Sequence, residues 1–451
     1  MNIKTLKKAM TAGSLLALFA GIALGQEQKG QAIHYRVTDL GLVGPTPGPL
    51  AIQNNGLFAE SVAVSNAWHA AISFQGRTPI DLAKTGGLGG PNSAGFGVNE
   101  SVQAAGEAET VDSNSEDFCG FGTQHVCAAF LWQNGVMRAL PLLRDENGVE
   151  GQNAGAKGIN IWGQVAGSAE NTTLDSTCPA YDTALLQYQT YQFKPVIWTH
   201  GEIRQLPTAD IDSKGKAFND PDGVVFSISD SGQAVGATGT CTGFTGFSYL
   251  NALHATLWRN GSVIDLGNLG GTGPQPPLGF GNFAYDVNSS GQVVGTSGTS
   301  DGLQHAFFWS PETLIQDVGT ISSDVASVGL AISDLGDIGG ISFPAGSLLA
   351  VPTASPRAFL RPKGGTMVDL NSLIPADSEL YLFSTCSINS RGEIIGLALD
   401  PQFNLHGYLA IPTNSAADSM AELSAESRSS RFAYAWQVLR DRRGPFRAGW
   451  R

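Results

Sequence analysis

The sequence lacks an apolar stretch long enough to cross a bilayer. Its most apolar run, over residues 15–24, is shorter than the roughly 20 residues that a membrane-spanning helix needs. Lys4, Lys7 and Lys8 precede this run, and Gly25 follows it. That order is typical of a signal peptide, and no Cys comes next to accept a lipid. We therefore expect residues 1–25 to be removed and the mature protein to be secreted or periplasmic, without a membrane span.

Positive charge is also scarce. The formal net charge is -13, which disfavours nucleic acid as a partner because phosphate binding depends on Lys and Arg. Charged residues make up only 14% of the chain, whereas there are 57 Gly and 22 Pro. This composition favours a turn-rich all-β protein over a helical one.

Familiar catalytic motifs are absent as well. The sequence contains no HExxH, no GxSxG, no P-loop and no paired CxxC. Four of its seven His occupy one position of a repeat, which favours a structural role over catalysis. The sequence therefore predicts no catalytic residues and no cofactor, although it leaves calcium open.

A repeated phrase is the dominant feature that is present. Its best copy runs from Val287 to Gly295, an apolar strand, a polar turn with Gly291, and a second apolar strand. Such a phrase predicts a β-hairpin, because the turn Gly takes positive φ without a Cβ penalty. The turn position recurs seven times along the chain, at Gly56, Val102, Gly163, Gly232, Gly291, Gly336 and Gly392.

Each hairpin, strands a and b, is followed by a third apolar strand c and, except in the seventh unit, by a fourth strand d. His305-Ala-Phe-Phe-Trp309 is typical of strand c, and the segment 315–319 is typical of strand d. Four short strands per unit predict a seven-bladed β-propeller over residues 26–414. The seventh unit lacks strand d, and an unassigned d-like strand lies at 35–41. We expect the N-terminal strand to complete the last blade and close the ring.

A second pattern links strands c and d. Where c begins with His, d often carries an Asp 11 or 12 residues later, so that the two side chains share one face of the sheet. The predicted pairs are His69 with Asp81, His254 with Asp265, His305 with Asp317 and, across the closure, His406 with Asp39.

The chain resembles the HAF repeat proteins, a family of exported bacterial repeats. The resemblance rests on His305-Ala306-Phe307 and on the run from Asp265 to Gly271, and it covers roughly residues 35–414. It implies an extracellular, β-propeller-like protein with no established chemistry. Val102 in place of the turn Gly and Lys194 in place of the strand-c His depart from the pattern. Residues 415–451 form an Arg-rich tail that we expect to be mobile.

Nearly all length variation falls in the b-to-c and blade-to-blade connections, which share one face of a propeller. We expect a site on this long-loop face, near the third and fourth units. Aromatic residues of its loops form a candidate ligand platform or, alternatively, pack the loops onto each other. These residues are Tyr181, Tyr188, Tyr191, Phe193, Phe244, Phe247 and Tyr249. Calcium ligands or a solvated turn are the alternatives for Asp210, Asp212, Asn219, Asp220 and Asp222.

Five cysteines remain to be placed. Cys119 and Cys127 bracket one loop, and Cys178 and Cys241 lie in equivalent loops of adjacent units. We predict these two disulfides, each stabilising by about 2–4 kcal/mol. Cys386 is then expected to be a buried, inert thiol on an inner strand.

Three functions are compatible with these patterns. The sequence favours a non-enzymatic binding or interaction module that presents its long-loop face to a glycan, peptide or protein. The first alternative is a propeller-type glycan hydrolase or lyase that works in a central funnel. The second is a cell-surface structural protein that associates with itself.

Overall fold

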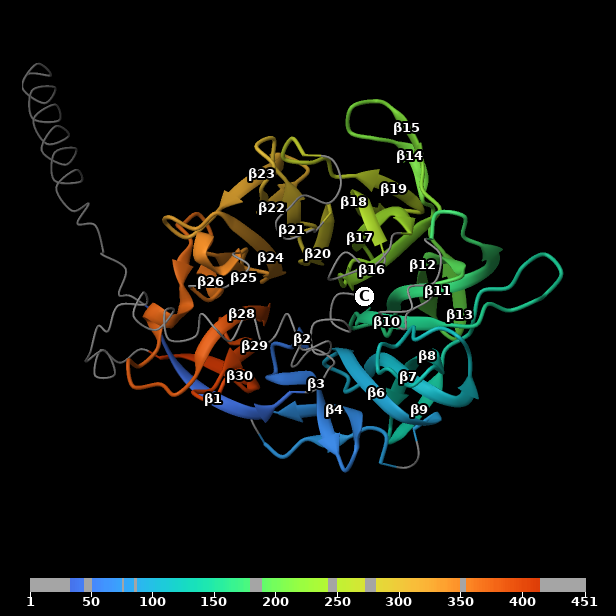
Figure 1. Cartoon of the computed structure of the whole chain (residues 1–451), viewed down its shortest axis with the longest axis horizontal. Coiled ribbons are helices and arrows are strands. Elements are labelled where there is room, and N and C mark those ends of the chain that lie inside the picture. The colour runs from blue at the N-terminus through green and yellow to red at the C-terminus, as the bar shows by residue number, and fades with distance from the viewer. Residues whose placement is uncertain are drawn as a thin grey trace, which may run out of the picture.

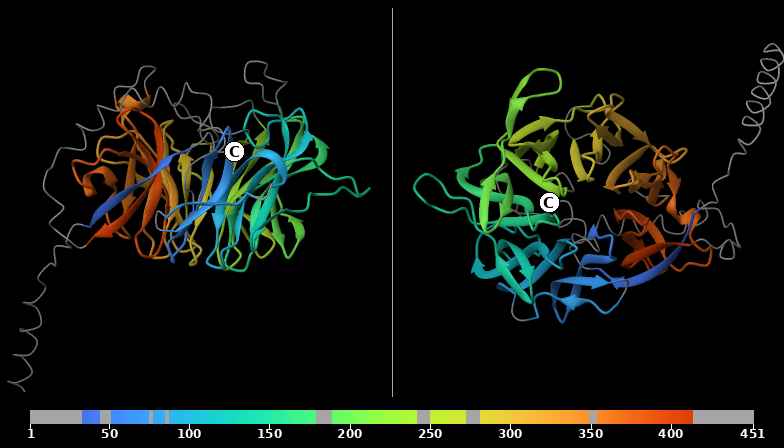
Figure 2. Two further views of the ribbon diagram at one scale, coloured as in Figure 1. Left: turned by 90° about the horizontal axis from the view of Figure 1, so that it is seen from below. Right: turned by 180° about the vertical axis from the view of Figure 1, so that it is seen from behind.

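Seven antiparallel sheets of four strands each surround a central axis (Figures 1 and 2). The computed structural model describes residues 33–43, 51–74, 77–84, 87–178, 189–241, 250–271, 281–348 and 354–413. The predicted signal peptide and the tail 415–451 lie outside these residues. The chain is all-β and forms a seven-bladed β-propeller, which confirms the predicted fold class.

Each blade begins at the axis and runs outward (Figure 1). The first three blades consist of β2 (Ala51–Ile52), β3 (Leu57–Val64), β4 (Ala67–Phe74) and β5 (Ile80–Asp81); β6 (Gly89–Val98), β7 (Ala104–Ser113), β8 (His125–Gln133) and β9 (Val136–Ala139); and β10 (Ala154–Ile159), β11 (Val165–Leu174), β12 (Tyr191–Thr199) and β13 (Glu202–Gln205). A separate hairpin, β14 (Ala209–Ile211) and β15 (Ala217–Asn219), precedes the fourth blade.

The remaining blades follow the same order. They consist of β16 (Asp222–Ile228), β17 (Ala234–Cys241), β18 (Leu250–Arg259) and β19 (Ser262–Asp265); β20 (Phe283–Val287), β21 (Val293–Gly298), β22 (Gln304–Ser310) and β23 (Leu314–Gly319); β24 (Ala326–Ile332), β25 (Ile338–Phe343), β26 (Arg357–Arg361) and β27 (Val368–Asp369); and β28 (Tyr381–Ile388), β29 (Ile394–Leu399) and β30 (Leu405–Thr413) with β1 (His34–Leu42). The helices of the described ranges are two single 3₁₀ turns, η1 (Ala345–Leu348) and η2 (Leu370–Leu373), so no helix there has the length or apolarity to traverse a bilayer.

The N-terminal strand closes the ring as predicted. β1 pairs antiparallel with β30, from His34 opposite Thr413 to Leu42 opposite His406. At this junction His406 Nδ1 lies 2.8 Å from the Asp39 carboxylate. Two further hydrogen bonds, such as Ser390 N to Asn54 Oδ1 at 2.8 Å, join the turns of the seventh and first blades. The first and last segments of the described chain therefore share one blade.

A β-bulge in the inner strand explains much of the repeated phrase. In the fifth blade the register shifts between Ala284 and Asp286, so Tyr285 is an extra residue in β20. The bulge brings the carbonyl oxygen of Phe283 over Gly295, where a Cβ atom would lie only 1.9 Å from it. The ring of Phe307 covers the other side of Gly295. The close approach of the carbonyl and of the ring leaves no room for a side chain, so strand b needs glycine at this position.

The Asn of the turn links neighbouring blades. Asn288 Oδ1 accepts hydrogen bonds from the turn's own backbone, whereas its Nδ2 donates to the carbonyl of Ser333 in the next blade at 3.1 Å. The same bond recurs from Asn99 to Asn160, from Asn160 to Ser229 and from Asn389 to Gln53. These bonds join neighbouring blades at four of the seven junctions, all at one end of the central channel.

Three of the four predicted His and Asp pairs are present. His69 contacts Asp81 at 3.0 Å, His305 contacts Asp317 at 2.8 Å, and the third is the closure pair described above. The prediction for His254 is wrong, since its Nδ1 lies 2.8 Å from Asp220.

The β14–β15 hairpin accounts for the exception. Its turn residue Ser213 donates its backbone N–H to Asp265 at 2.8 Å, and its Phe218 stacks on the His254 ring at 4.3 Å. Burial lowers the pKa of His254, but the hydrogen bond and charge of Asp220 outweigh it and hold that pKa above the ordinary value. The spacing of 11 or 12 residues from the His of strand c to the Asp of strand d does not reveal that Asp220, which precedes the blade, binds His254 instead.

Both predicted disulfides are present. Cys119, in the connection from β7 to β8, is bonded to Cys127 of β8, and Cys178 is bonded to Cys241 across the third and fourth blades. Cys386 is the free cysteine. Its thiol is half-buried on β28, and burial raises its pKa to about 11.

Thiol titration checks this assignment. We expect one reactive thiol per chain in the denatured, unreduced protein, because only Cys386 is free. The native protein should react far more slowly, since the thiolate is the reactive form and the raised pKa suppresses it. A dithionitrobenzoate assay with and without denaturant measures both values. Three or more thiols in the denatured protein would contradict the pairing.

Candidate active site in the central channel

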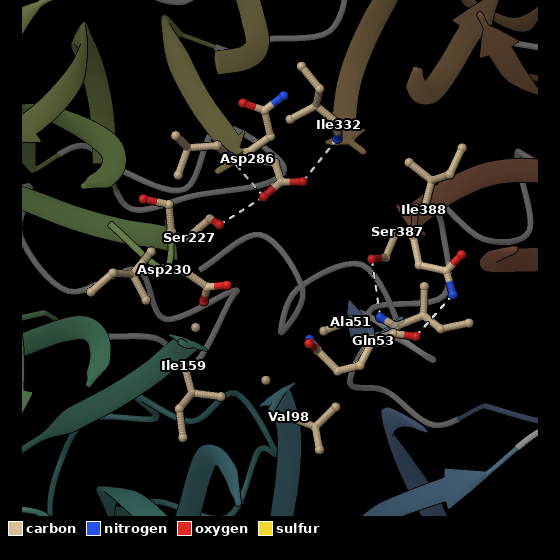
Figure 3. A pocket seen from close by; sticks show the side chains of 18 of the residues that line it. Ala51, Gln53, Val98, Ile159, Ser227, Asp230, Asp286, Ile332, Ser387 and Ile388 are labelled. Atoms are coloured by element: carbon tan, nitrogen blue, oxygen red, sulfur yellow. Dashed lines mark hydrogen bonds between the residues drawn. The ribbon is translucent and has the colours of Figure 1, made fainter. Parts of the chain in front are cut away.

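A cavity of about 380 Å³ occupies the central channel at the end where strands a pass into the a-to-b turns. Residues of all seven inner strands line it (Figure 3). Seven buried β-branched residues at one repeat position form a collar around it: Ile52, Val98, Ile159, Ile228, Val287, Ile332 and Ile388. The cavity lies on the tight-turn face, opposite the long-loop face on which the sequence placed a site.

The inner-strand bulges direct a second set of side chains toward the cavity. Register shifts of the Tyr285 kind occur in six blades, and the extra residue lines the cavity in each of them. These residues are Phe96, Lys157, Phe226, Tyr285, Leu330 and Cys386. A bulge re-aims a side chain at the edge of a sheet, which makes the channel wall different from what strand alternation alone predicts.

Asp286 is the acidic group in the wall of this cavity. Its carboxylate accepts hydrogen bonds from Ser227 Oγ at 2.8 Å and from the backbone N–H of Ile332 at 2.9 Å (Figure 3). These partners belong to the two neighbouring blades, so Asp286 joins three blades at the channel. The side chain is only partly exposed, and burial raises its pKa despite these donors, with a further contribution from the charge of Asp334.

Exposed acidic residues stand at the rim of the cavity. Asp230 accepts from Ile161 N at 3.1 Å, and Asp334 accepts from Ser289 N at 2.9 Å. Glu100 occupies the same turn position in the second blade and also lines the cavity. A rim with three carboxylates carries a negative potential that disfavours anionic ligands.

Within the described part of the chain, Lys157 is the one basic residue that lines the cavity. Its ammonium group lies 3.0 Å from Glu107 and 3.8 Å from the centre of the Phe96 ring. Both members of the ion pair are buried, with 6% and 1% of their side chains exposed. Because Glu107 neutralises it, Lys157 does not offset the acidic rim.

The sequence predicted no site role for Asp286, Asp230 or Asp334. Asp286 immediately precedes Val287 of the best repeat copy, at a position where the other six units have Ala51, Gly97, Gly158, Ser227, Ala331 and Ser387. A single carboxylate at a position that otherwise holds small residues was the available signal. Its position in the channel could not be recognised, because the bulges that create the wall are not apparent from the sequence pattern.

The predicted aromatic platform falls mostly outside the described residues. Tyr181, Tyr188, Phe244, Phe247 and Tyr249 lie there and stay a prediction. Phe193 is buried in the hydrophobic core of the ring. Tyr191 is half-buried at the start of β12, opposite Leu174.

The residues weighed as calcium ligands separate into two groups. Asp210 and Asn219 are exposed and Asp212 is half-buried on the β14–β15 hairpin, whereas Asp220 and Asp222 are buried. The Asp212 carboxylate accepts from the backbone of Lys216 and Lys214, which lowers its pKa. Asp220 binds His254 and Thr238. The hairpin group matches the solvated-turn alternative.

Comparison with known proteins finds no match in sequence and distant similarities in structure. No protein-family model and no curated protein matches the chain. Among solved structures, a mutant of puromycin hydrolase shares 13% identity with a TM-score of 0.44, covering 83% of this chain and 52% of that one. The β-propeller domain of the Trilobed protease from Pyrococcus furiosus shares 8% identity with a TM-score of 0.43, covering 87% and 100%. The oligogalacturonate lyase of Vibrio parahaemolyticus shares 8% identity with a TM-score of 0.44, covering 84% and 97%.

These similarities correct one expectation. The chain spans about half the length of the puromycin hydrolase, and all three TM-scores are below 0.5, so the β-propeller fold rests on the sheets described above and not on these similarities. The propellers that it resembles nevertheless carry the names of a hydrolase, a protease and a lyase. The expectation of a non-enzymatic binding module is therefore withdrawn.

Proposed function

We propose that the chain is an exported propeller-type hydrolase that cleaves a neutral glycan in the central channel by carboxyl-group acid and base chemistry. The observation that carries the proposal is Asp286, a partly exposed carboxyl group in the wall of the cavity whose pKa burial holds above the ordinary value. A carboxyl group that keeps its proton toward neutral pH can protonate a leaving-group oxygen. Export and membership of the HAF repeat family are part of the same proposal.

The second carboxyl group of such a reaction stands at the rim. Asp230 and Asp334 line the same cavity and are exposed, so either can act as the base that activates water. We assign this role to Asp230, because Asp334 also accepts hydrogen bonds from the Ser289 side chain and from Ser390 Oγ. The half-buried side chains of Phe226 and Leu330, which line the same cavity, provide an apolar surface against which a sugar ring can lie.

The charge of the cavity favours hydrolysis over lyase chemistry. A lyase that acts on uronic acids has to bind a carboxylate in its substrate, which calls for Arg or Lys. Lys157 is already paired with Glu107, and the rim is acidic. A neutral substrate and a hydrolytic reaction fit this environment better.

Asp286→Asn tests the proposal in the mature protein against chromogenic aryl glycosides of neutral oligosaccharides. We expect kcat to fall by at least ~100-fold, the scale of a lost general acid. The midpoint of thermal unfolding should change little, because Asn can accept from Ile332 N through its Oδ1 and donate to Ser227 Oγ through its Nδ2. The wild-type rate should decline as the pH rises through the raised pKa of Asp286 and the group loses its proton.

Ser387→Ala serves as the matched control. Ser387 Oγ accepts from Ile52 N at 3.2 Å at the position equivalent to Asp286, so its loss removes a link between blades without removing a carboxyl group. We expect this variant to keep the wild-type rate. The proposal fails if the wild type hydrolyses none of the glycosides, or if Asp286→Asn retains the rate.

A further inference from the structure

Asp175, Cys178 and Cys241 meet between the third and fourth blades, away from the central cavity. Asp175 and Cys178 follow β11, and Cys241 ends β17. One carboxylate oxygen and the two sulfur atoms all lie within 4.8 Å of one another. The sulfur atoms form the Cys178–Cys241 disulfide, so they are not available as ligands while the protein is oxidised.

A second carboxyl group, that of Asp222, adjoins Asp175. Both residues are buried, and the Oδ2 atom of each receives no hydrogen bond from any N–H or O–H donor in the described part of the chain. The charge of Asp175 acts on Asp222, and the charges of both act on Lys194, so the two carboxyl groups lie close together. Two buried carboxylate oxygens without a donor need a proton or a cation beside them.

The surrounding groups hold the other oxygen of each carboxylate. Asp175 Oδ1 accepts from the backbone N–H and the hydroxyl of Thr177 at 2.8 and 2.6 Å. Asp222 Oδ1 accepts from Phe193 N at 3.1 Å. Thr177 Oγ1 in turn accepts from Cys241 N at 2.9 Å, which ties the cysteine to the same network. One oxygen fixed by donors and one left open is the arrangement found around metal-ligating carboxylates.

Lys194 supplies the compensating charge. Its ammonium group donates to the carbonyl of Pro221. Burial lowers the pKa of Lys194, and the negative charges of Asp222 and Asp175 oppose this effect. Two thiolates and two carboxylates around a divalent ion carry a net charge of −2. Lys194 offsets half of this excess.

We propose that reduction of the Cys178–Cys241 disulfide creates a zinc site, with Cys178, Cys241 and Asp175 as ligands and Asp222 beside the fourth position. A dithiol or phosphine reductant opens the S–S bond and is itself oxidised, and the two thiols lose their protons to Zn²⁺ binding. Thiolate sulfur and carboxylate oxygen are both ligands that Zn²⁺ accepts in tetrahedral geometry. Small rotations of the cysteine side chains would separate the sulfur atoms, which now touch, to the distance set by Zn–S bonds of about 2.3 Å.

The site would give one junction two alternative links. The disulfide joins the third and fourth blades covalently under oxidising conditions, and the metal joins the same residues when thiols are reduced. A chain that has folded but not yet oxidised would thus already be fastened at this point. Metal binding to the folded state stabilises it by mass action.

The second disulfide provides an internal control. Within the described ranges, Asp175, Cys178 and Cys241 form the one group of three His, Cys, Asp or Glu residues close enough to share a metal ion. Cys119 and Cys127 therefore have no such carboxylate partner when reduced. Any zinc that depends on thiols in general, and not on this site, would bind equally after removal of either pair.

Metal titration of the mature, phosphine-reduced protein tests the proposal. We expect about one Zn²⁺ per chain by atomic absorption and a raised midpoint of thermal unfolding. Co²⁺ should give thiolate charge-transfer bands and the visible absorption of a tetrahedral ion. The Cys119→Ser/Cys127→Ser variant should retain all of these signals, and the Cys178→Ser/Cys241→Ser variant should lose them.

Asp175→Asn tests whether a loss of Zn²⁺ binding results only from unfolding. Its disulfide can still form, so its fold can be checked before reduction. After reduction it should bind Zn²⁺ at least ~10-fold more weakly than wild type, the scale of lost groups around a metal. Thiolate bands that persist without Cys178 and Cys241, or a folded reduced wild type that binds no metal, overturn the proposal.

Discussion

Deletion of β1 (His34–Leu42) is expected to unfold the protein, and attachment of the same strand after Thr413 is expected to restore it. β1 is the outer strand of the seventh blade and pairs with β30 over its full length. Tyr35 of β1 is buried in the same hydrophobic cluster as Tyr408 and Leu382. Loss of this strand exposes the cluster and an unpaired edge, so we expect a stability loss above about 4 kcal/mol together with aggregation.

The permuted chain tests whether β1 stabilises the protein by pairing with β30, whatever its place in the sequence. His34 is the register partner of Thr413, so a two-residue Asn-Gly loop can join them as a β-hairpin. This variant begins after residue 43 and ends with β1, so it holds every strand of the ring. Urea unfolding followed by circular dichroism, with gel filtration for aggregation, compares it with the deletion. A deletion variant that unfolds at the wild-type urea concentration would mean that β1 does not fasten the ring.

The closure was predictable because a strand that is missing from one unit of a repeat can be recognised by comparison with the other units. Six units show strand d after strand c, so its absence after His406 and the surplus strand at 35–41 point to one missing partner. The same logic predicted the disulfides, since Cys178 and Cys241 follow equivalent strands of neighbouring units. The fold class follows from local patterns that recur, and recurrence averages out the errors of any single strand.

The candidate site was not predictable in this way, because it depends on departures from the repeat. Asp286 replaces a small residue once, and its position in the wall of the channel requires the bulge at Tyr285. Loop lengths directed attention to the long-loop face, whereas the cavity lies at the ends with tight turns. Loop length reports where insertions are tolerated. It does not report where inner strands leave a space at the axis.

The acid that binds the residue near the start of strand c also departs from the repeat in two blades. In the fourth blade, Asp220 lies two residues before β16 and binds both His254 and Thr238. In the sixth blade, Asp324 lies two residues before β24 and binds both Arg357 and Ser342. Arg357 thus stands where the repeat has His, and its acid comes from the inner side of the blade. The interval from strand c to strand d conceals this second source of acid.

Arg357 is the residue whose loss we expect to be the most costly point substitution. Arg357 Nε donates to Asp324 Oδ2 at 3.0 Å, its Nη2 donates to Asp324 Oδ1, and its Nη1 lies 3.5 Å from Asp369 Oδ2. The Asp324 side chain is fully buried, and 7% of the Asp369 side chain is exposed. Arg357→Met leaves two buried carboxylates without their cation, so we expect a loss of about 3–5 kcal/mol at neutral pH.

The pH dependence and a matched variant identify the cause of this loss. Burial already raises the pKa of Asp369 in the presence of Arg357, so protonation should relieve the variant as pH falls, and its deficit should shrink. Arg144→Met removes an ion pair with Glu150 whose side chains are 66% and 46% exposed, and it should cost less than about 1 kcal/mol. Urea unfolding of both variants between pH 5 and pH 8 measures the difference. If the two substitutions cost the same, the Arg357 cluster is not the anchor of the sixth blade, and packing against Phe359 and Leu370 has to hold that blade instead.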